Sequence, residues 1–309
     1  MVSDNAAALA ILLKSRTRAS VRRLLRDGDG PEAVLARHHR DWRSELADLK
    51  TQTRASGVAV YAYGEAGFPE RLLHIPDAPM VLFCRGDQAA LEQPSVAIVG
   101  ARRASRLGCE TASQLAKTLC AARVSVVSGL ALGIDSAAHC GAIEPADSQQ
   151  SGELRHSIAV QGSGLGRIQP VSNLPLAERL IAAGGLLVSE YPLGMSARPQ
   201  HFPERNRLIS GLADVVVVVE AGERSGSLIT ARLALEQGRE VVAVPGAISQ
   251  PNSRGVHRLL KQGAGLVDCA QDVFDALGNS RLQNGGQAES AGTDPEPDLI
   301  SPEAVAGLD

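Results

Sequence analysis

The sequence predicts an α/β protein built on a Rossmann-like, doubly wound and mostly parallel sheet, preceded by a small helical domain. Three observations predict this fold. Nearly continuous apolar strands recur from Ser95 onward, amphipathic helical stretches separate them, and most of these strands end in Gly, Ser or Glu before a loop. Strands that are apolar throughout are typical of a sheet covered by helices on both faces. Ligands of such sheets bind beyond the carboxyl ends of the strands, so we expect functional residues in these loops.

The elements follow one another in four regions. Residues 1–56 have apolar positions spaced by three and four, which predicts a domain of short helices. Residues 57–94 consist of short extended pieces divided by Gly and Pro, and we expect this entry segment to pack on the core. Residues 95–278 carry the alternating strands and helices of the Rossmann-like domain. Residues 279–309 are rich in Gly, Ser, Gln, Asp and Pro, which predicts a flexible tail.

Composition narrows the class of protein. The 309 residues are 44% hydrophobic and 21% charged, as is typical of a globular protein with a sizeable core. A net charge of −3 argues against a protein-wide electrostatic grip on nucleic acid, although a local basic patch fits it. Five scattered cysteines without CxxC spacing indicate neither a zinc site nor a disulfide framework. We expect a cytoplasmic protein with no metal, no cofactor and no membrane segment.

The first strand of the repeat runs into the loop GARRASRLGCETA. Gly100 allows a tight turn, and Ser105 and Gly108 precede a helix whose N-terminal N–H groups would face the crevice. Three arginines surround this turn: Arg102, Arg103 and Arg106. Guanidinium groups suit phosphate because of their bidentate geometry, so we expect a phosphate site here. A plain Gly-rich turn is the alternative, since the loop matches neither the GxGxxG nor the Walker pattern.

The second strand ends in SGLALGIDSAAHCGA. Asp135 and His139 are four residues apart, a spacing that puts two side chains on one helix face and allows a catalytic pair. A structural role is the stronger expectation. In it Asp135 caps the helix, and His139 is hydrogen-bonded beneath the loop.

The segment FPERNR, residues 202–207, is a basic stretch that begins with an aromatic side chain. Phe202 stands next to Arg205, Asn206 and Arg207. An exposed aromatic flanked by arginines can stack a nucleobase while the cations hold its phosphates. We expect Phe202 to lie in a polar loop bounded by proline. The alternative is that Phe202 packs under this loop and the arginines form a solvated helix face.

A Ser/Gly loop follows the apolar strand of residues 215–219. Ser225, Gly226 and Ser227 offer hydroxyl and amide groups to a phosphate or ribose, or one serine caps the next helix. Further basic and polar residues are expected near the same rim: Arg239 before a later strand, and Ser253, Arg254, Gly255, His257, Arg258 and Lys261 in a later loop. This local concentration of arginines favours a polyanionic ligand.

In this order the blocks resemble the DNA-processing protein A family, also called Smf. The matching blocks are IVGARRAS, VVSGLALGIDSAAHCGA, GGLLVSEYPLG, the run from FPERNR to VPG, and SRGVHRLLKQGA. The resemblance covers roughly residues 64–277. It implies a non-enzymatic protein that binds single-stranded DNA, protects it and loads the RecA recombinase during natural transformation. It also implies a homodimer and a SAM-like N-terminal domain.

The resemblance carries site roles onto individual positions. It implies a phosphate contact at Arg102, base stacking at Phe202 and backbone contacts at Arg205 and Arg207. It also places binding residues in the loop of Ser225, Gly226 and Ser227 and at Arg239. The chain departs from the family at Gln169, where a Tyr is usual, and at His257, where an Asn is usual. A C-terminal winged helix, present in many members, is expected to be absent or truncated.

Two further expectations concern the N-terminal helices and a rival function. The N-terminal helices lack the Gly-rich hairpin with which helix-hairpin-helix modules hold phosphate, so the sequence assigns them no DNA contact. The rival function is that of a nucleotide-processing, phosphoribohydrolase-like enzyme. It would use Glu190 or Glu220, each at a predicted strand end, with an arginine to cleave a glycosidic bond.

Overall fold

The computed structural model describes residues 2–25, 30–144 and 156–289. The chain begins with four helices: α1 (Asp4–Ser15), α2 (Arg18–Leu24), α3 (Pro31–His38) and α4 (Trp42–Ala55). The side chains from Ala6 to Leu13 of α1 are at most 9% exposed, because α3, α4 and strand β1 (Val58–Ala62) all pack against this helix. The N-terminal helices therefore share a hydrophobic core with one edge of the sheet.

The described residues contain one nine-stranded sheet. The strands after β1 are β2 (Val81–Gly86), β3 (Ser95–Val99), β4 (Ser125–Ser128), β5 (Ser157–Gln161), β6 (Leu186–Ser189), β7 (Val215–Val218), β8 (Glu240–Ala243) and β9 (Gly265–Leu266). Their spatial order is β1-β2-β6-β5-β4-β3-β7-β8-β9. Strands β3 to β9 pair in parallel, whereas β1 and β2 are antiparallel. The predicted α/β fold with a mostly parallel sheet is confirmed.

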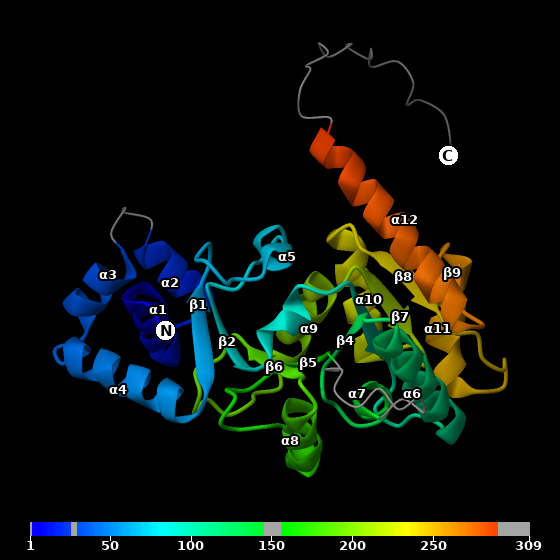
Figure 1. The fold of residues 1–309 in the computed structure, drawn as a ribbon, viewed down its shortest axis with the longest axis horizontal. Coiled ribbons are helices and arrows are strands. Elements are labelled where there is room, and N and C mark those ends of the chain that lie inside the picture. The colour runs from blue at the N-terminus through cyan, green and yellow to red at the C-terminus, as the bar shows by residue number, and fades with distance from the viewer. Residues whose placement is uncertain (1, 26–29, 145–155, 290–309) are drawn as a thin grey trace, which may run out of the picture.

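Helices cover both faces of the sheet (Figure 1). They are α5 (Glu70–Leu73), α6 (Arg106–Ala121), α7 (Ile134–Ile143), α8 (Leu174–Ala182), α9 (His201–Leu212), α10 (Gly226–Glu236), α11 (Arg254–Lys261) and α12 (Ala270–Glu289). Alternate residues of β3 point to opposite faces, as a strand requires. Val96 and Ile98 share a core with α6, α7 and α12. Ala97 and Val99 share a core with α9, α10 and α11.

The topology sets where a ligand crevice forms. From β3 the chain winds outward through β4, β5 and β6, and then returns to the other side of β3 with β7. The chain leaves β3 toward β4 and leaves β7 toward β8, that is, in opposite directions along the sheet. This divergence opens a crevice at the carboxyl ends of β3 and β7. Two loops, after β3 and after β7, meet there.

Two regions differ from the sequence prediction. The entry segment, residues 57–94, does more than pack on the core, because it supplies strands β1 and β2 of the sheet. Residues 279–289, predicted as part of a flexible tail, continue helix α12, and buried Ser280 donates to the carbonyl of Asp214 at 3.3 Å. The rest of the predicted tail, residues 290–309, lies outside the described part. Within that part no helix combines the length and apolarity of a membrane span.

Candidate nucleic-acid interface

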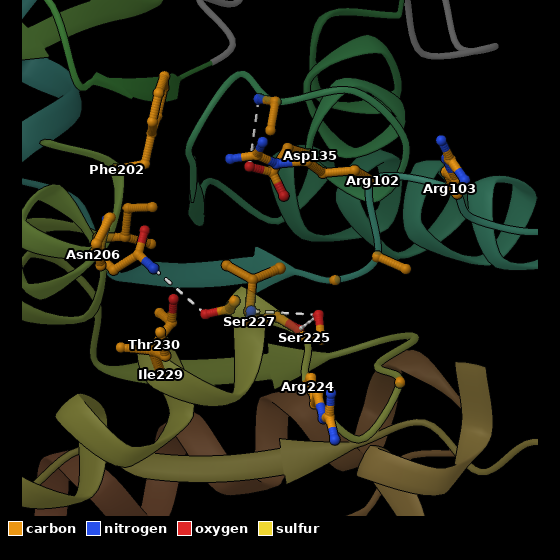
Figure 2. Close-up of a pocket in the computed structure, with 18 of the residues that line it drawn as sticks. Arg102, Arg103, Asp135, Phe202, Asn206, Arg224, Ser225, Ser227, Ile229 and Thr230 are labelled. Carbon is orange, nitrogen blue, oxygen red and sulfur yellow. Dashed lines mark hydrogen bonds between the residues drawn. The ribbon is translucent and has the colours of Figure 1, made fainter. Parts of the chain in front are cut away.

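A cavity of about 570 Å³ lies at the crevice beyond β3 and β7 (Figure 2). Most of its lining comes from four segments: the loop after β3, the loop after β4, the first turns of α9, and the loop that leads into α10. Residues 100–103, 202–206 and 224–227 thus come together although they are far apart in the sequence. We refer to this space as the switch-point cavity.

Phe202 lies in the first turn of α9, not in the loop that the sequence predicts, because the helix already begins at His201. Its ring is partly exposed and lines the switch-point cavity. The guanidinium carbon of Arg102 lies 5.3 Å from the ring centroid. A Cβ added to Gly162 would sit 3.2 Å from Cδ1 of Phe202, so the ring also rests on the backbone of Gly162. Phe202 therefore keeps a fixed position beside an arginine.

Three arginines at this cavity are available for an anion. Arg102, Arg103 and Arg224 are exposed and line the cavity (Figure 2). None of the three forms an ion pair with another residue of the described chain. A guanidinium without a carboxylate partner keeps its donors for a phosphate.

The N-terminus of α10 faces the same cavity. Ser225 caps the helix: its Oγ accepts from the backbone N–H of Ser227 at 3.4 Å and lies 2.8 Å from Oγ of Ser227. Asn206 on α9 donates to the carbonyl of Gly226 at 3.4 Å and ties the two helices together. The first N–H groups of a helix and its dipole attract anions. The predicted Ser/Gly loop is thus both a helix cap and one wall of the cavity.

Arg205 forms part of the floor of the cavity. It is 3% exposed, and its Nη1 donates to the carbonyl of Val160 at 2.5 Å. Burial lowers the pKa of Arg205 to about 10, against the opposing charge of Asp135, so the guanidinium stays protonated at neutral pH. Gly129 is needed beneath it, since an added Cβ would lie 2.2 Å from Nη1. Arg205 contributes positive potential from below rather than an exposed contact.

Asp135 does not cap α7 as the sequence predicts. The N-cap residue is Gly133, and the carboxylate of Asp135 instead accepts from the backbone N–H groups of Gly129 at 3.1 Å and Ala131 at 3.4 Å. His139 is fully buried with Nδ1 2.8 Å from Oγ of Ser157, as expected for a structural residue. Burial, together with the charge of Arg205, lowers the pKa of His139 to about 3.

Two of the arginines predicted to contact DNA lie away from the cavity. Arg207 is buried on another side of α9, where its two Nη atoms each lie 2.7 Å from a carboxylate oxygen of Glu190. Arg239 precedes β8 and therefore sits at the amino edge of the parallel sheet, opposite the crevice. Its Nη2 donates to the carbonyls of Gly211 and Arg71. Both arginines are committed to protein contacts.

The predicted phosphate site at the N-terminus of α6 holds a carboxylate of the chain itself. Ser105 caps α6 and accepts from the N–H of Gly108 at 2.9 Å. Glu220, two residues after the end of β7, accepts from the N–H of Ser105 at 2.9 Å and also from its hydroxyl. A Cβ on Gly108 would lie 2.5 Å from Cδ of Glu220, so the glycine makes room for this carboxylate. Neither Ser105 nor Gly108 lines the switch-point cavity.

The later loop residues support the cavity from outside. The N–H of Gly255 donates to the carbonyl of Ala221 at 2.8 Å, and an added Cβ would lie 2.7 Å from that oxygen. Ser253 is buried, and Nε2 of His257 lies 2.9 Å from the carbonyl oxygen of Gly246. These contacts fix loops of the chain and do not reach the cavity.

Known proteins match the region of the chain that contains these segments. The family model described as DNA recombination-mediator protein A matches residues 59–278. The chain belongs to this family. Protein Smf of Escherichia coli K12 is 46% identical over 210 residues, which cover 68% of this chain and 54% of that protein. DNA processing protein DprA of Bacillus subtilis is 38% identical over 252 residues, which cover 81% of this chain and 82% of that protein. The chain thus matches about half the length of the Escherichia coli relative.

Two solved structures of relatives have the same fold. The X-ray structure of DNA processing protein A from Streptococcus pneumoniae superposes with a TM-score of 0.70 and 32% identity, and the match covers 89% of this chain and 98% of that chain. DNA processing protein A from Helicobacter pylori superposes with a TM-score of 0.61 and 29% identity, covering 74% of this chain and 96% of that chain. That structure is described as showing the single-stranded DNA binding mode of the Helicobacter protein.

The structure adds two residues that the sequence analysis did not single out. Arg224 extends the row of arginines, and its position directly before the Ser/Gly loop was a usable signal. Asn252 lines the cavity and donates to the carbonyl of Arg103 at 2.9 Å and to Glu220 at 3.1 Å. Its role depends on a loop that is distant in the sequence, so no local pattern indicates it.

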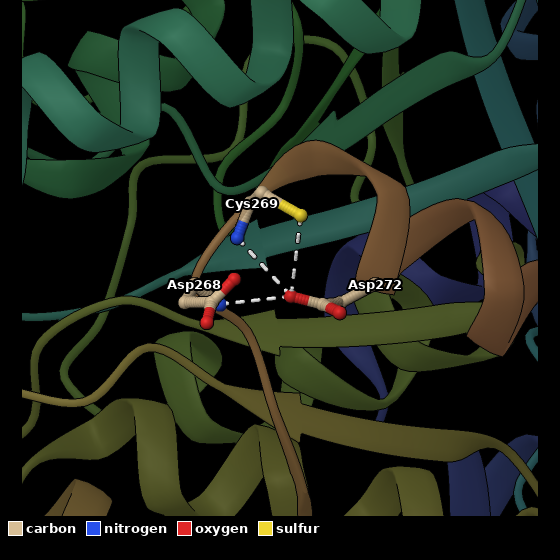
Figure 3. Close-up of side chains that lie close together, drawn as sticks. All are labelled: Asp268, Cys269 and Asp272. Carbon is tan, nitrogen blue, oxygen red and sulfur yellow. Dashed lines mark hydrogen bonds between the residues drawn. The ribbon is translucent and has the colours of Figure 1, made fainter.

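A separate cluster of potential metal ligands stands at the start of α12 (Figure 3). The carboxylate of Asp272 accepts from the backbone N–H groups of Asp268 at 2.9 Å and Cys269 at 3.1 Å. These hydrogen bonds lower the pKa of Asp272. The arrangement is that of a side chain satisfying free N–H groups at a helix start, and we infer no metal site from it.

Proposed function

We propose that the chain binds single-stranded DNA in the switch-point cavity and acts as a recombination mediator. In this role it protects incoming single strands and loads RecA onto them during natural transformation. One observation carries the proposal: three arginines without ion-pair partners in the described chain line one cavity with an aromatic ring at the carboxyl edge of the sheet, and one of them, Arg102, lies over that ring. The family and the single-stranded DNA described for the Helicobacter relative support it.

The proposed contacts divide into phosphate contacts and one base contact. Arg102, Arg103 and Arg224, with the N–H groups at the start of α10, bind phosphates. A base stacks on Phe202. Because Arg102 covers the ring in the structure, base entry and the turning of Arg102 toward a phosphate belong to one step. Bases of a duplex are already stacked and do not offer a face to Phe202, so single strands are preferred.

A binding experiment tests this function directly. Fluorescence anisotropy of a labelled oligo-dT and of a duplex of equal length is measured across a salt series. We expect tighter binding of the single strand and a steep fall of affinity with salt, because released counterions drive phosphate binding. Equal affinity for both, or none for either, would refute the proposal.

RecA as partner, a homodimer and a cytoplasmic location belong to the same proposal. They rest on membership of the family. A loading assay tests the first of them: the protein should speed RecA filament formation on single strands that are already coated by a single-strand-binding protein. Sedimentation tests the oligomeric state.

The rival enzymatic function has less support in the structure. Glu190 is 5% exposed and bound on two sides by arginines, and Glu220 is hydrogen-bonded to Ser105. Neither carboxylate lines the switch-point cavity. Incubation with nucleoside monophosphates tests this function, because release of free nucleobase would favour it.

A further inference from the structure

A second cavity, of about 460 Å³, lies where the N-terminal helices meet α9. Residues of α1, α2 and their connection form one wall, and residues 190–204 form the other. We call it the junction cavity. The start of α9 separates it from the switch-point cavity: Phe202 and Asn206 line the first, whereas His201 and Glu204 line the second. The two cavities are therefore neighbours across one helical turn.

The carboxylates of the junction cavity are already neutralised by arginines. Glu190 binds Arg18 at 2.7 Å and Arg207 at 2.7 Å. Asp77 is held by the same two arginines, at 3.3 and 3.1 Å, and by Arg22 at 2.9 Å. This network raises the pKa of Arg18 through its carboxylate neighbours despite burial, and lowers the pKa of Asp77. The acidic groups are thus part of the fold rather than free charges.

Glu204, the remaining acidic residue that lines the cavity, is also engaged. Its carboxylate lies 3.4 Å from Arg18 and accepts from the hydroxyl of Tyr191 at 3.2 Å. The ring of Tyr191 stacks on His201 with centroids 4.1 Å apart. Both rings are buried, so they stiffen the wall and offer no face to a base.

Three further cations have no such partner. Lys14, Arg16 and Arg198 line the cavity, and none forms an ion pair within the described chain. Nε of Arg16 is buried, and no atom of the described residues forms a hydrogen bond with it. With Arg18 and Arg22, the residues that the structure describes in this lining include five cationic side chains and three carboxylates. A concave, net positive site with unused guanidinium donors suits the oxygens of a phosphate chain.

We infer that the junction cavity binds the sugar–phosphate backbone of a strand that continues from the switch-point cavity around the start of α9. The inference rests on the proposed function. Since no exposed aromatic among the described residues lines the junction cavity, the contacts there are to phosphate and are independent of base sequence. The N-terminal helices, to which the sequence assigns no DNA contact, then form part of the binding surface through Lys14 and Arg16.

Oligonucleotide length separates the two cavities experimentally. A short oligo-dT of about 6 nucleotides fills the switch-point cavity alone, and one of about 20 nucleotides reaches both. The double variant Arg16→Ala/Arg198→Ala should bind the short strand like the unmodified chain and the long strand more weakly. Two lost phosphate contacts reduce the salt slope for the long strand by about 1.4. The ratio of the long-strand affinity of the unmodified chain to that of the double variant then falls about sevenfold between 50 and 200 mM salt.

The controls keep the result specific. Arg40→Ala/Arg54→Ala removes the same charge from exposed positions of the helical region that lie outside the junction cavity, and it should leave both affinities unchanged. Arg198→Glu alone changes an exposed loop residue and guards against misfolding of the double variant. It should also weaken only the long strand.

Each outcome decides between the two proposals. If the double variant binds the long strand like the unmodified chain, the inference fails while the proposed function stands. Equal weakening of short and long strands overturns it as well, because a general loss of charge then explains the effect. If the unmodified chain binds neither strand, the proposed function itself has failed.

Discussion

Replacing Phe202 with alanine tests the base contact in isolation. The ring is partly exposed and belongs to none of the hydrophobic core clusters of the described chain, so the fold should persist. Stacking of a base on an aromatic side chain contributes about 1–3 kcal/mol. Its loss should raise the Kd for oligo-dT by about 5-fold to 150-fold, since 1.4 kcal/mol corresponds to a factor of about ten.

The salt dependence of the same variant separates stacking from charge. Phe202→Ala removes no charge, so the slope of log K against log salt should stay unchanged while the whole line moves down. The ring is also the cation–π partner of Arg102, an interaction of about 0.5–1 kcal/mol at exposed sites. Loss of this cation–π interaction leaves Arg102 free before DNA binds. That gain offsets a small part of the affinity lost with the stacking contact.

Fluorescence anisotropy of a labelled oligo-dT provides the assay, with circular dichroism and thermal unfolding as checks of the fold. Phe202→Leu is the matched control because it keeps apolar bulk but has no π face. It should recover little of the lost affinity. Unchanged Kd in Phe202→Ala would make the ring a packing residue, and a changed slope would show that the variant acts through Arg102 instead.

Four further predictions concern charge, burial and pH. Arg102→Ala should lower the salt slope for single strands by about 0.7, the value of one phosphate contact, and an unaltered slope would remove Arg102 from the phosphate ligands. Arg207→Met leaves Glu190 without its bidentate partner and should cost about 3–5 kcal/mol of unfolding free energy in urea titration; a loss of DNA affinity with unchanged stability would contradict this structural role. Gly129→Ala places a Cβ against buried Arg205 and should lower stability by about 1–3 kcal/mol, and a neutral effect would show that the floor of the cavity is not tightly packed. The pKa of His139 is about 3 in the folded chain, whereas an ordinary histidine has a pKa of about 6.5. Below pH of about 6.5 the unfolded chain therefore binds a proton that the folded chain does not. The free energy of unfolding should fall by up to about 1.4 kcal/mol per pH unit as the pH drops from about 6.5 toward 3. Urea titrations of the unmodified chain and His139→Gln at pH values of about 6.5 and 5.5 check this, since the variant should lack that share of the decline.

Much of the fold follows from local pattern, and the errors about the site have a common cause. The valines of residues 215–218 form a buried strand as predicted, because a continuous apolar run leaves few other options. The arginines of the FPERNR motif were expected at one place because they are close in sequence. On a helix, however, residues two apart point in nearly opposite directions. Phe202, Arg205, Asn206 and Ile209 follow the spacing of three and four and line the cavity, while Arg207 does not.

Two other site residues differ in how far the sequence could place them. The position of Arg239 was predictable, because a residue that precedes a parallel strand lies at the amino edge of the sheet. The role of Glu220 was not, because its partners Ser105 and Asn252 come from loops that are distant in the sequence. Only the completed sheet brings these loops together. The DNA contacts of the remaining cavity residues stay a prediction until binding is measured.

The carboxylate of Glu220 has a consequence for selectivity among nucleotides. In dinucleotide-binding sheets the pyrophosphate rests at the helix that follows the first strand of the unit. Here the corresponding place, the start of α6, is filled from within by a side chain that carries the same sign of charge. A free coenzyme or triphosphate would have to displace that carboxylate and also overcome its repulsion. We therefore expect abundant small metabolites to compete poorly with a polymer that lies across the neighbouring cavity and presents several phosphates at once.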